Sequence, residues 1–112
     1  MTFNTRIIDG KSIAATTLSG LAADILSLTR AGYKPGLAVI RVGDDPASAI
    51  YVRNKINACA AHHIHSEHHT RPATAPRDDL MNLIRDLNAR PDIHGILLQL
   101  PLPAQLDPLD LI

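Results

Sequence analysis

The chain has 112 residues, 46% of them hydrophobic, with no Trp and a single Phe. This composition suits one domain with an aliphatic core and excludes a disordered chain. Lys plus Arg and Asp plus Glu both total 11, and this lack of a basic excess argues against a nucleic-acid-binding protein.

Cys59 is the only cysteine, so an internal disulfide is excluded. Residues 1–20 contain no apolar run long enough for a signal peptide or a membrane span. We therefore expect a soluble cytoplasmic protein.

The first half of the chain predicts a helix, a strand and a second helix. Apolar residues repeat at helical spacing over positions 18–29, namely Leu18, Leu21, Ala22, Ile25 and Leu28. Gly32 follows at a helix end, and residues 37–42 form a short apolar run typical of a buried strand. Residues 43–46 then predict a turn into a helix over 46–62, with Asp44 or Asp45 as its cap and Pro46 in its first turn.

The second half repeats this alternation. Residues 64–70 predict a weaker, histidine-rich strand. Residues 74–79 predict a helix start with a cap residue, a first-turn proline and acidic side chains, followed by an apolar stripe at Leu80, Leu83, Ile84 and Leu87. Residues 93–100 form a third apolar run, which two prolines end. This order predicts an α/β fold, a three-layer α/β/α arrangement with a small, mainly parallel sheet. Functional residues are expected beyond the carboxyl ends of its strands.

Three polar residues are candidates for a reactive site. Tyr51 and Lys55 are four positions apart on the second predicted helix, so they share a face. A lysine in a partly closed cleft suits proton transfer near neutral pH, although the spacing also fits an ordinary solvated helix. Gln99 lies near the end of an apolar strand, where its amide needs a partner. A ligand or a neighbouring lysine could be that partner. Alternatively, the amide could cap the backbone of a loop.

Two other sets of residues are weaker candidates for ligand sites. His65, Glu67 and His69 would point to one side of a strand, and two histidines with a carboxylate can bind a metal. An exposed sheet edge is the simpler explanation, because ligands on one flat strand face rarely converge on one ion. The two aspartates at 44 and 45 argue against a phosphate site at the second helix. Cys59 is expected to pack as a small apolar residue without a chemical role.

Several segments, in order, resemble one enzyme family. They are residues 7–11 (Ile-Ile-Asp-Gly-Lys), residues 35–48 with the following Tyr-Val-Arg-Asn-Lys at 51–55, and residues 95–103 (Gly-Ile-Leu-Leu-Gln-Leu-Pro-Leu-Pro). Together they are similar to the bifunctional methylenetetrahydrofolate dehydrogenase/methenyltetrahydrofolate cyclohydrolase family, from about Arg6 to the last residue. Two long motifs at the right separation are far more specific than a short pattern. Arg90 departs from the family, which usually has Asp or Asn there, at a position expected to be structural.

The resemblance implies an activity and a set of site residues. Family members oxidise 5,10-methylenetetrahydrofolate with NADP and hydrolyse the methenyl product to 10-formyltetrahydrofolate, in one-carbon metabolism and purine biosynthesis. Tyr51 would lie against the aromatic part of the folate, and Lys55 would be the proton-transferring group. Gln99 would contact and tune that lysine, making these three the catalytic residues. Leu100 and Pro101 would complete the substrate-binding set by lining the folate pocket.

The resemblance also implies what this chain lacks. Residues 1–112 would be the catalytic domain truncated at its C-terminal end, without the NADP-binding domain and without the family's Asp-Val-Asp-Gly segment. The sequence has neither Gly-x-Gly-x-x-Gly nor a Walker loop, so no cofactor is expected to bind this chain alone. The partners implied are tetrahydrofolate derivatives and, for the family enzyme, a second subunit in a homodimer, with no nucleic acid and no membrane. Two alternatives stay open, a non-catalytic remnant that binds folate weakly and a histidine-cluster metal-binding protein.

Overall fold

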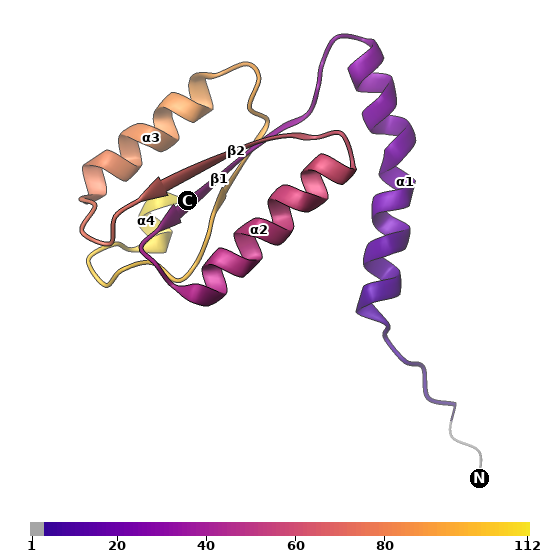
Figure 1. The fold of residues 1–112 in the computed structure, drawn as a ribbon, viewed down its shortest axis with the longest axis horizontal. Coiled ribbons are helices and arrows are strands. Elements are labelled where there is room, and N and C mark those ends of the chain that lie inside the picture. The colour runs from indigo at the N-terminus through magenta and orange to yellow at the C-terminus, as the bar shows by residue number, and fades with distance from the viewer. Residues whose placement is uncertain (1–3) are drawn as a thin grey trace.

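A computed structural model of the chain describes residues 4–112. Helices and strands alternate along the chain (Figure 1). Their bounds are α1 (Gly10–Arg30), β1 (Gly36–Val42), α2 (Pro46–Ala61), β2 (His65–Arg71), α3 (Arg77–Ala89), β3 (Gly95–Leu98) and α4 (Pro108–Leu111). The alternation confirms the α/β class predicted from the sequence.

The three strands form one parallel sheet in the order β2-β1-β3. The central strand β1 is the apolar run over 36–42, and its residues Ala38, Val39 and Ile40 are completely buried. Helices α2 and α3 lie on opposite sides of this sheet (Figure 1). A strand that is covered on both faces needs a continuous apolar run, so the sequence of β1 is explained by its central position.

The main core lies between the sheet and α3. Ala38, Ile40 and Val42 on one side of β1 form a buried cluster with Leu80 and Leu87 of α3. This cluster confirms that the stripe beginning at Leu80 is the inward face of a helix. Because side chains alternate along a strand, Val39 points to the other face of the sheet, towards α2, on which Val52 is buried.

Helix α1 stands apart from the sheet (Figure 1). It begins at Gly10, earlier than the apolar spacing over 18–29 predicted, because Asp9 accepts a hydrogen bond from the Ser12 backbone N–H at 3.1 Å and so caps the helix there. Ile25 is its only buried residue. The predicted Gly32 lies just after the helix end and has a φ of 90°, a conformation that glycine adopts without steric cost.

The same helix departs from the expectation about membrane spans. Its 21 residues, with a mean hydropathy of 1.3 over the most apolar window, make it long and apolar enough to cross a membrane by length and composition alone. Residues 1–20 by themselves lack such a run, whereas the apolar positions of α1 extend from Ile13 to Leu28. The helix also includes Lys11, Asp24 and Arg30.

Two smaller differences concern element ends, and a third concerns a helix that was not predicted. Pro76 is the residue before α3, and no side chain caps this helix, contrary to the predicted cap residue. Strand β3 ends at Leu98, earlier than the apolar run ends, although the Gln99 backbone N–H still donates to the Ile40 carbonyl at 2.9 Å. Helix α4, capped by Asp107, was not predicted because its single turn is too short to show a periodicity.

Candidate functional site

The candidate site begins with the turn between β1 and α2. Gly43 has a φ of 86°, which lets the chain reverse direction directly after the buried strand. Asp45 then accepts a hydrogen bond from the Ser48 backbone N–H at 2.8 Å, and Pro46 occupies the first turn of α2. This start fixes α2 beside the carboxyl end of β1, as the sequence predicted, and so places Ser48, Tyr51 and Lys55 on successive turns.

The structure brings the three candidate residues together. The Lys55 Nζ donates a hydrogen bond to the Gln99 Oε1 at 3.0 Å, joining α2 to the segment that follows β3. The same ammonium group lies 5.5 Å from the centre of the Tyr51 ring, within the range of a cation–π interaction. Tyr51, Lys55 and Gln99 therefore form one cluster at the carboxyl ends of β1 and β3.

A buried serine supports this cluster. The Gln99 Nε2 donates to the Leu100 carbonyl oxygen at 3.0 Å, and the Ser48 hydroxyl donates to that same oxygen at 3.2 Å. Ser48 is only 2% exposed and is the one buried polar residue of the described chain. The sequence reasoning did not select Ser48. Its position one turn before Tyr51 was the available signal, because both residues face the same strand end.

The cluster is open on its outer side. Tyr51 is 56% exposed and Leu100 is 48% exposed, and Pro101, which a cis peptide bond joins to Leu100, is exposed as well. An exposed aromatic face beside an ammonium group and apolar residues can stack against a flat ring and hold a polar group of that ring. The lysine can also give a proton to a bound molecule or take one from it.

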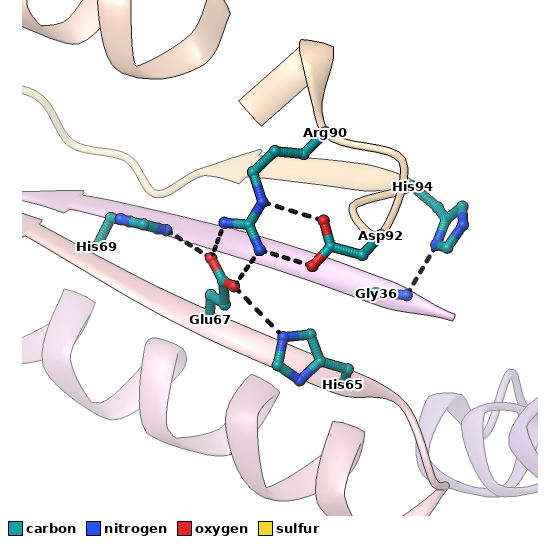
Figure 2. A network of polar contacts seen from close by, with 7 residues as sticks. All are labelled: Gly36, His65, Glu67, His69, Arg90, Asp92 and His94. Carbon is teal, nitrogen blue, oxygen red and sulfur yellow. Dashed lines mark hydrogen bonds and ion pairs between the residues drawn. The ribbon is translucent and has the colours of Figure 1, made fainter. Parts of the chain in front are cut away.

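The histidine-rich strand β2 carries a separate polar network, drawn in Figure 2. Glu67 accepts hydrogen bonds from Arg90 at 2.7 and 2.6 Å, and Arg90 also donates to both oxygens of Asp92. His65 and His69 lie 3.4 and 3.1 Å from the Glu67 oxygens, on one side of the strand as predicted. These hydrogen bonds, above all those from Arg90, lower the pKa of Glu67 to about 2.

This network bears on the metal-binding alternative. Ligand atoms of His65, Glu67 and Asp92 lie within 4.8 Å of one another, which a single ion would require. The Arg90 guanidinium, however, donates to both of the carboxylates in this group. A cation bound there would have to displace a positive charge from its two partners, so the geometry favours the ion-pair network over a metal site.

Cys59 is buried in α2, where burial raises the pKa of its thiol. A raised pKa disfavours the reactive thiolate. This environment agrees with the expectation that the residue packs as an apolar side chain.

Comparison with known proteins identifies the family to which the chain belongs. Residues 8–112 match the family described as "Tetrahydrofolate dehydrogenase/cyclohydrolase, catalytic domain". The chain is 53% identical over 102 residues to the bifunctional protein FolD of Dechloromonas aromatica and 55% identical over 103 residues to that of Nitratidesulfovibrio vulgaris. Each match covers 91% of this chain and 36% of the relative. The chain thus spans about a third of the length of the curated relatives that it matches.

Solved structures agree with this match. The bifunctional FolD dehydrogenase/cyclohydrolase of Campylobacter jejuni superposes with a TM-score of 0.88 at 37% identity, over 92% of this chain and 36% of that one. The Trypanosoma brucei enzyme, solved with an NADP cofactor and an inhibitor, gives a TM-score of 0.87 at 30% identity, over 98% of this chain and 38% of its own. The matched region includes α1, so this apolar helix has a counterpart in the family domain.

Proposed function

Because the chain belongs to the tetrahydrofolate dehydrogenase/cyclohydrolase catalytic-domain family, we propose that it is the folate-binding catalytic portion of an enzyme of one-carbon metabolism. The full reaction sequence would be oxidation of 5,10-methylenetetrahydrofolate to the methenyl form and hydrolysis of that form to 10-formyltetrahydrofolate. The observation that carries the proposal is the 3.0 Å hydrogen bond between Lys55 and Gln99, because it joins two motifs that lie far apart in the sequence.

Each site residue has a role in this proposal that accords with its position. The exposed ring of Tyr51 would stack on the aromatic part of the folate. Leu100 and Pro101 would line the apolar wall beside it. Gln99 holds the Lys55 ammonium without adding a charge, and Ser48 is a positioning residue, because it fixes the Leu100 carbonyl to which Gln99 is also bonded.

The hydrolytic step needs one group that moves a proton. A water molecule adds to the methenyl carbon, and one of its two protons passes to Lys55, whose ammonium group must first give up a proton to act as a base. The bond between that carbon and N5 of the folate then breaks, and Lys55 returns the proton to N5. The remaining hydroxyl proton passes to solvent water as the C=O bond forms, which leaves the formyl group on N10. The lysine ends the step as it began, so it acts as general base and then as general acid.

The nicotinamide cofactor does not fit the described residues. A dinucleotide is usually held by its diphosphate at a helix N-terminus that follows a strand. Here the carboxylates of Asp44 and Asp45 precede α2, and Asp78 and Asp79 lie in the first turn of α3, so both positions repel an anion. We therefore assign no cofactor site to this chain, whose part in the hydride transfer would be to hold the folate that gives up the hydride. NADP belongs to the longer family enzyme in this proposal.

The proposal also covers the partners of the chain, its location in the cell and its activity when isolated. Tetrahydrofolate derivatives are the proposed partners, together with a second subunit in the family enzyme, and the cytoplasm is the proposed location. Activity of this chain by itself should be low, because the open cluster admits water and leaves the substrate poorly positioned. The alternative that the chain binds folate without catalysis is supported by the 56% exposure of Tyr51.

The test is hydrolysis of methenyltetrahydrofolate, followed by the loss of its absorbance. We expect the unaltered chain to hydrolyse the substrate faster than buffer alone. In Lys55→Ala, the rate above that of buffer should fall by about 100-fold or more, the usual contribution of a general acid or base. Lys11→Ala, which alters an exposed lysine of α1, is the matched control and should hydrolyse normally. Equal rates in the two variants would contradict the role of Lys55. A rate no higher than buffer in the unaltered chain would support the non-catalytic alternative.

A further inference from the structure

A small hollow lies on the other side of α2, next to strand β2. It has a volume of about 270 Å³ and is lined by Arg41, Ala49, Val52, Arg53, Ile56 and His68. This volume is just below the range of roughly 300–1,000 Å³ for ligand pockets, so the hollow suits a small ion or group. None of its lining residues belongs to the Tyr51, Lys55 and Gln99 cluster, so the hollow is a separate site from the one proposed for the folate.

Three basic side chains from three elements meet at this hollow. Arg41 comes from β1, His68 from β2 and Arg53 from α2. Val39 lies opposite His68 and Thr70 lies opposite Arg41 in the parallel pair of strands, so both basic residues point to the α2 side of the sheet. No carboxylate lines the hollow, and its charge is therefore positive.

The arginines of this hollow differ from Arg77 and Arg90, the two arginines that pair with carboxylates within residues 4–112. Arg77 pairs with Asp110 and Asp78, and Arg90 pairs with Glu67 and Asp92. By contrast, Arg41 and Arg53 make no ion pair within residues 4–112. The Arg41 Nε is also buried without a hydrogen-bond partner. A buried charged donor without a partner is costly, and a bound anion would supply the partner.

The pKa of the neighbouring His68 depends on burial and on the same positive charge. Burial lowers the pKa of His68, and the charges of Arg41 and then His69 lower it further. The imidazole Nε2 lies 3.3 Å from the Thr70 hydroxyl. An anion between the two arginines would offset their charges, and the protonated imidazole would then be favoured.

We propose that Arg41, Arg53 and His68 form a binding site for a phosphate group. Guanidinium groups donate paired hydrogen bonds to phosphate oxygens. Donors that reach the hollow from three elements match the separate oxygens of a tetrahedral anion better than the two oxygens of a planar carboxylate. The site takes inorganic phosphate or the phosphate group of a small metabolite.

The test is an NMR titration of the full chain with inorganic phosphate, with His68 assigned through the His68→Gln variant. Saturable shifts of the His68 ring resonances are expected, with a rise of its pKa that sodium chloride at equal ionic strength does not produce. Arg53→Gln, which alters an exposed residue and should not affect folding, is expected to weaken phosphate binding by about ten-fold or more, as is Arg41→Gln. Arg85→Gln, on the exposed face of α3, is the matched control and should bind as the unaltered chain does.

Three results would overturn the proposal. One is a His68 titration that phosphate and chloride change equally. Another is unchanged phosphate binding in Arg53→Gln, whose folding is checked by its circular dichroism. The third is binding of acetate as tight as that of phosphate, which would show that the hollow responds to charge rather than to a tetrahedral anion.

Discussion

Glu67 is the residue on which the polar contacts of the β2 edge converge. Its carboxylate is bonded to Arg90 through two nitrogens and lies beside His65 and His69. Strand β2 is an edge strand, with β1 on one side only, and Arg90 follows α3 directly. The contact between Glu67 and Arg90 therefore ties the edge of the sheet to the end of a helix, across one face of the molecule.

This contact predicts a pH dependence of stability. The folded pKa of Glu67 is about 2, below the ordinary value of 4.5. A carboxyl group whose pKa is lowered by folding stabilises the native state above its unfolded pKa, and this contribution is lost as the pH falls through the folded pKa. We expect Glu67→Gln to be less stable than the unaltered chain at pH 7, with a difference that shrinks between about pH 4.5 and pH 2.

Urea unfolding at a series of pH values measures this difference. Asp86→Asn is the matched control, because Asp86 is an exposed acidic residue of α3 that makes no ion pair within residues 4–112. A difference for Glu67→Gln that stayed constant down to pH 2 would mean that the carboxylate does not carry the stabilisation.

At the scale of elements, Gly36 joins the start of β1 to the loop before β3. Its backbone N–H donates to the His94 Nδ1 at 2.9 Å, and its carbonyl accepts from the His94 N–H at 2.8 Å (Figure 2 draws the first of these). A Cβ atom at Gly36 would overlap the backbone carbonyl of Asp92. The close approach of these two backbone segments thus depends on the missing side chain.

We predict that Gly36→Ala destabilises the fold by about 1–3 kcal/mol, the usual cost of an overpacked site. Gly20→Ala is the matched control. A Cβ atom at Gly20 meets nothing within 4 Å, and the change in a helix interior should stabilise by about 0.5–1 kcal/mol. Thermal unfolding of both variants tests the pair, and equal melting temperatures would contradict the close approach at Gly36.

Element prediction succeeded where a local signal was strong. Strand β1 was predicted from a continuous apolar run, and α2 from a cap at Asp44 or Asp45 and from Pro46, whose effects are local. Helix α1 was predicted too short, because its first turns are rich in serine and threonine and lack an apolar stripe. The contacts of Arg90 were not predicted, because its partners Glu67 and Asp92 depend on where the chain folds back.

At the scale of the whole molecule, the site could not be predicted from the spacing of residues in the sequence alone. Tyr51 and Lys55 were placed on one helix face by their spacing, but spacing alone could not bring Gln99 to them across three further elements. The family resemblance supplied that pairing. Ser48 and the basic hollow beside β2 were missed, because both depend on side chains that meet only after the sheet has formed.

Helix α1 leads to the last prediction, which concerns association of the chain. Its side chains Leu21, Leu26 and Leu28 are 43%, 50% and 47% exposed, and Ile13 is 55% exposed. Apolar surface gathered on one helix favours contact with another apolar surface. In sedimentation equilibrium we expect a concentration-dependent mass above the 12.1 kDa of one chain.

Replacing Leu21 and Leu28 together by Gln should restore that single-chain mass, because both leucines lie on one face of α1. Leu109→Gln, which alters an apolar residue of α4 that is 85% exposed, should still associate, and a monomeric unaltered chain would contradict the prediction.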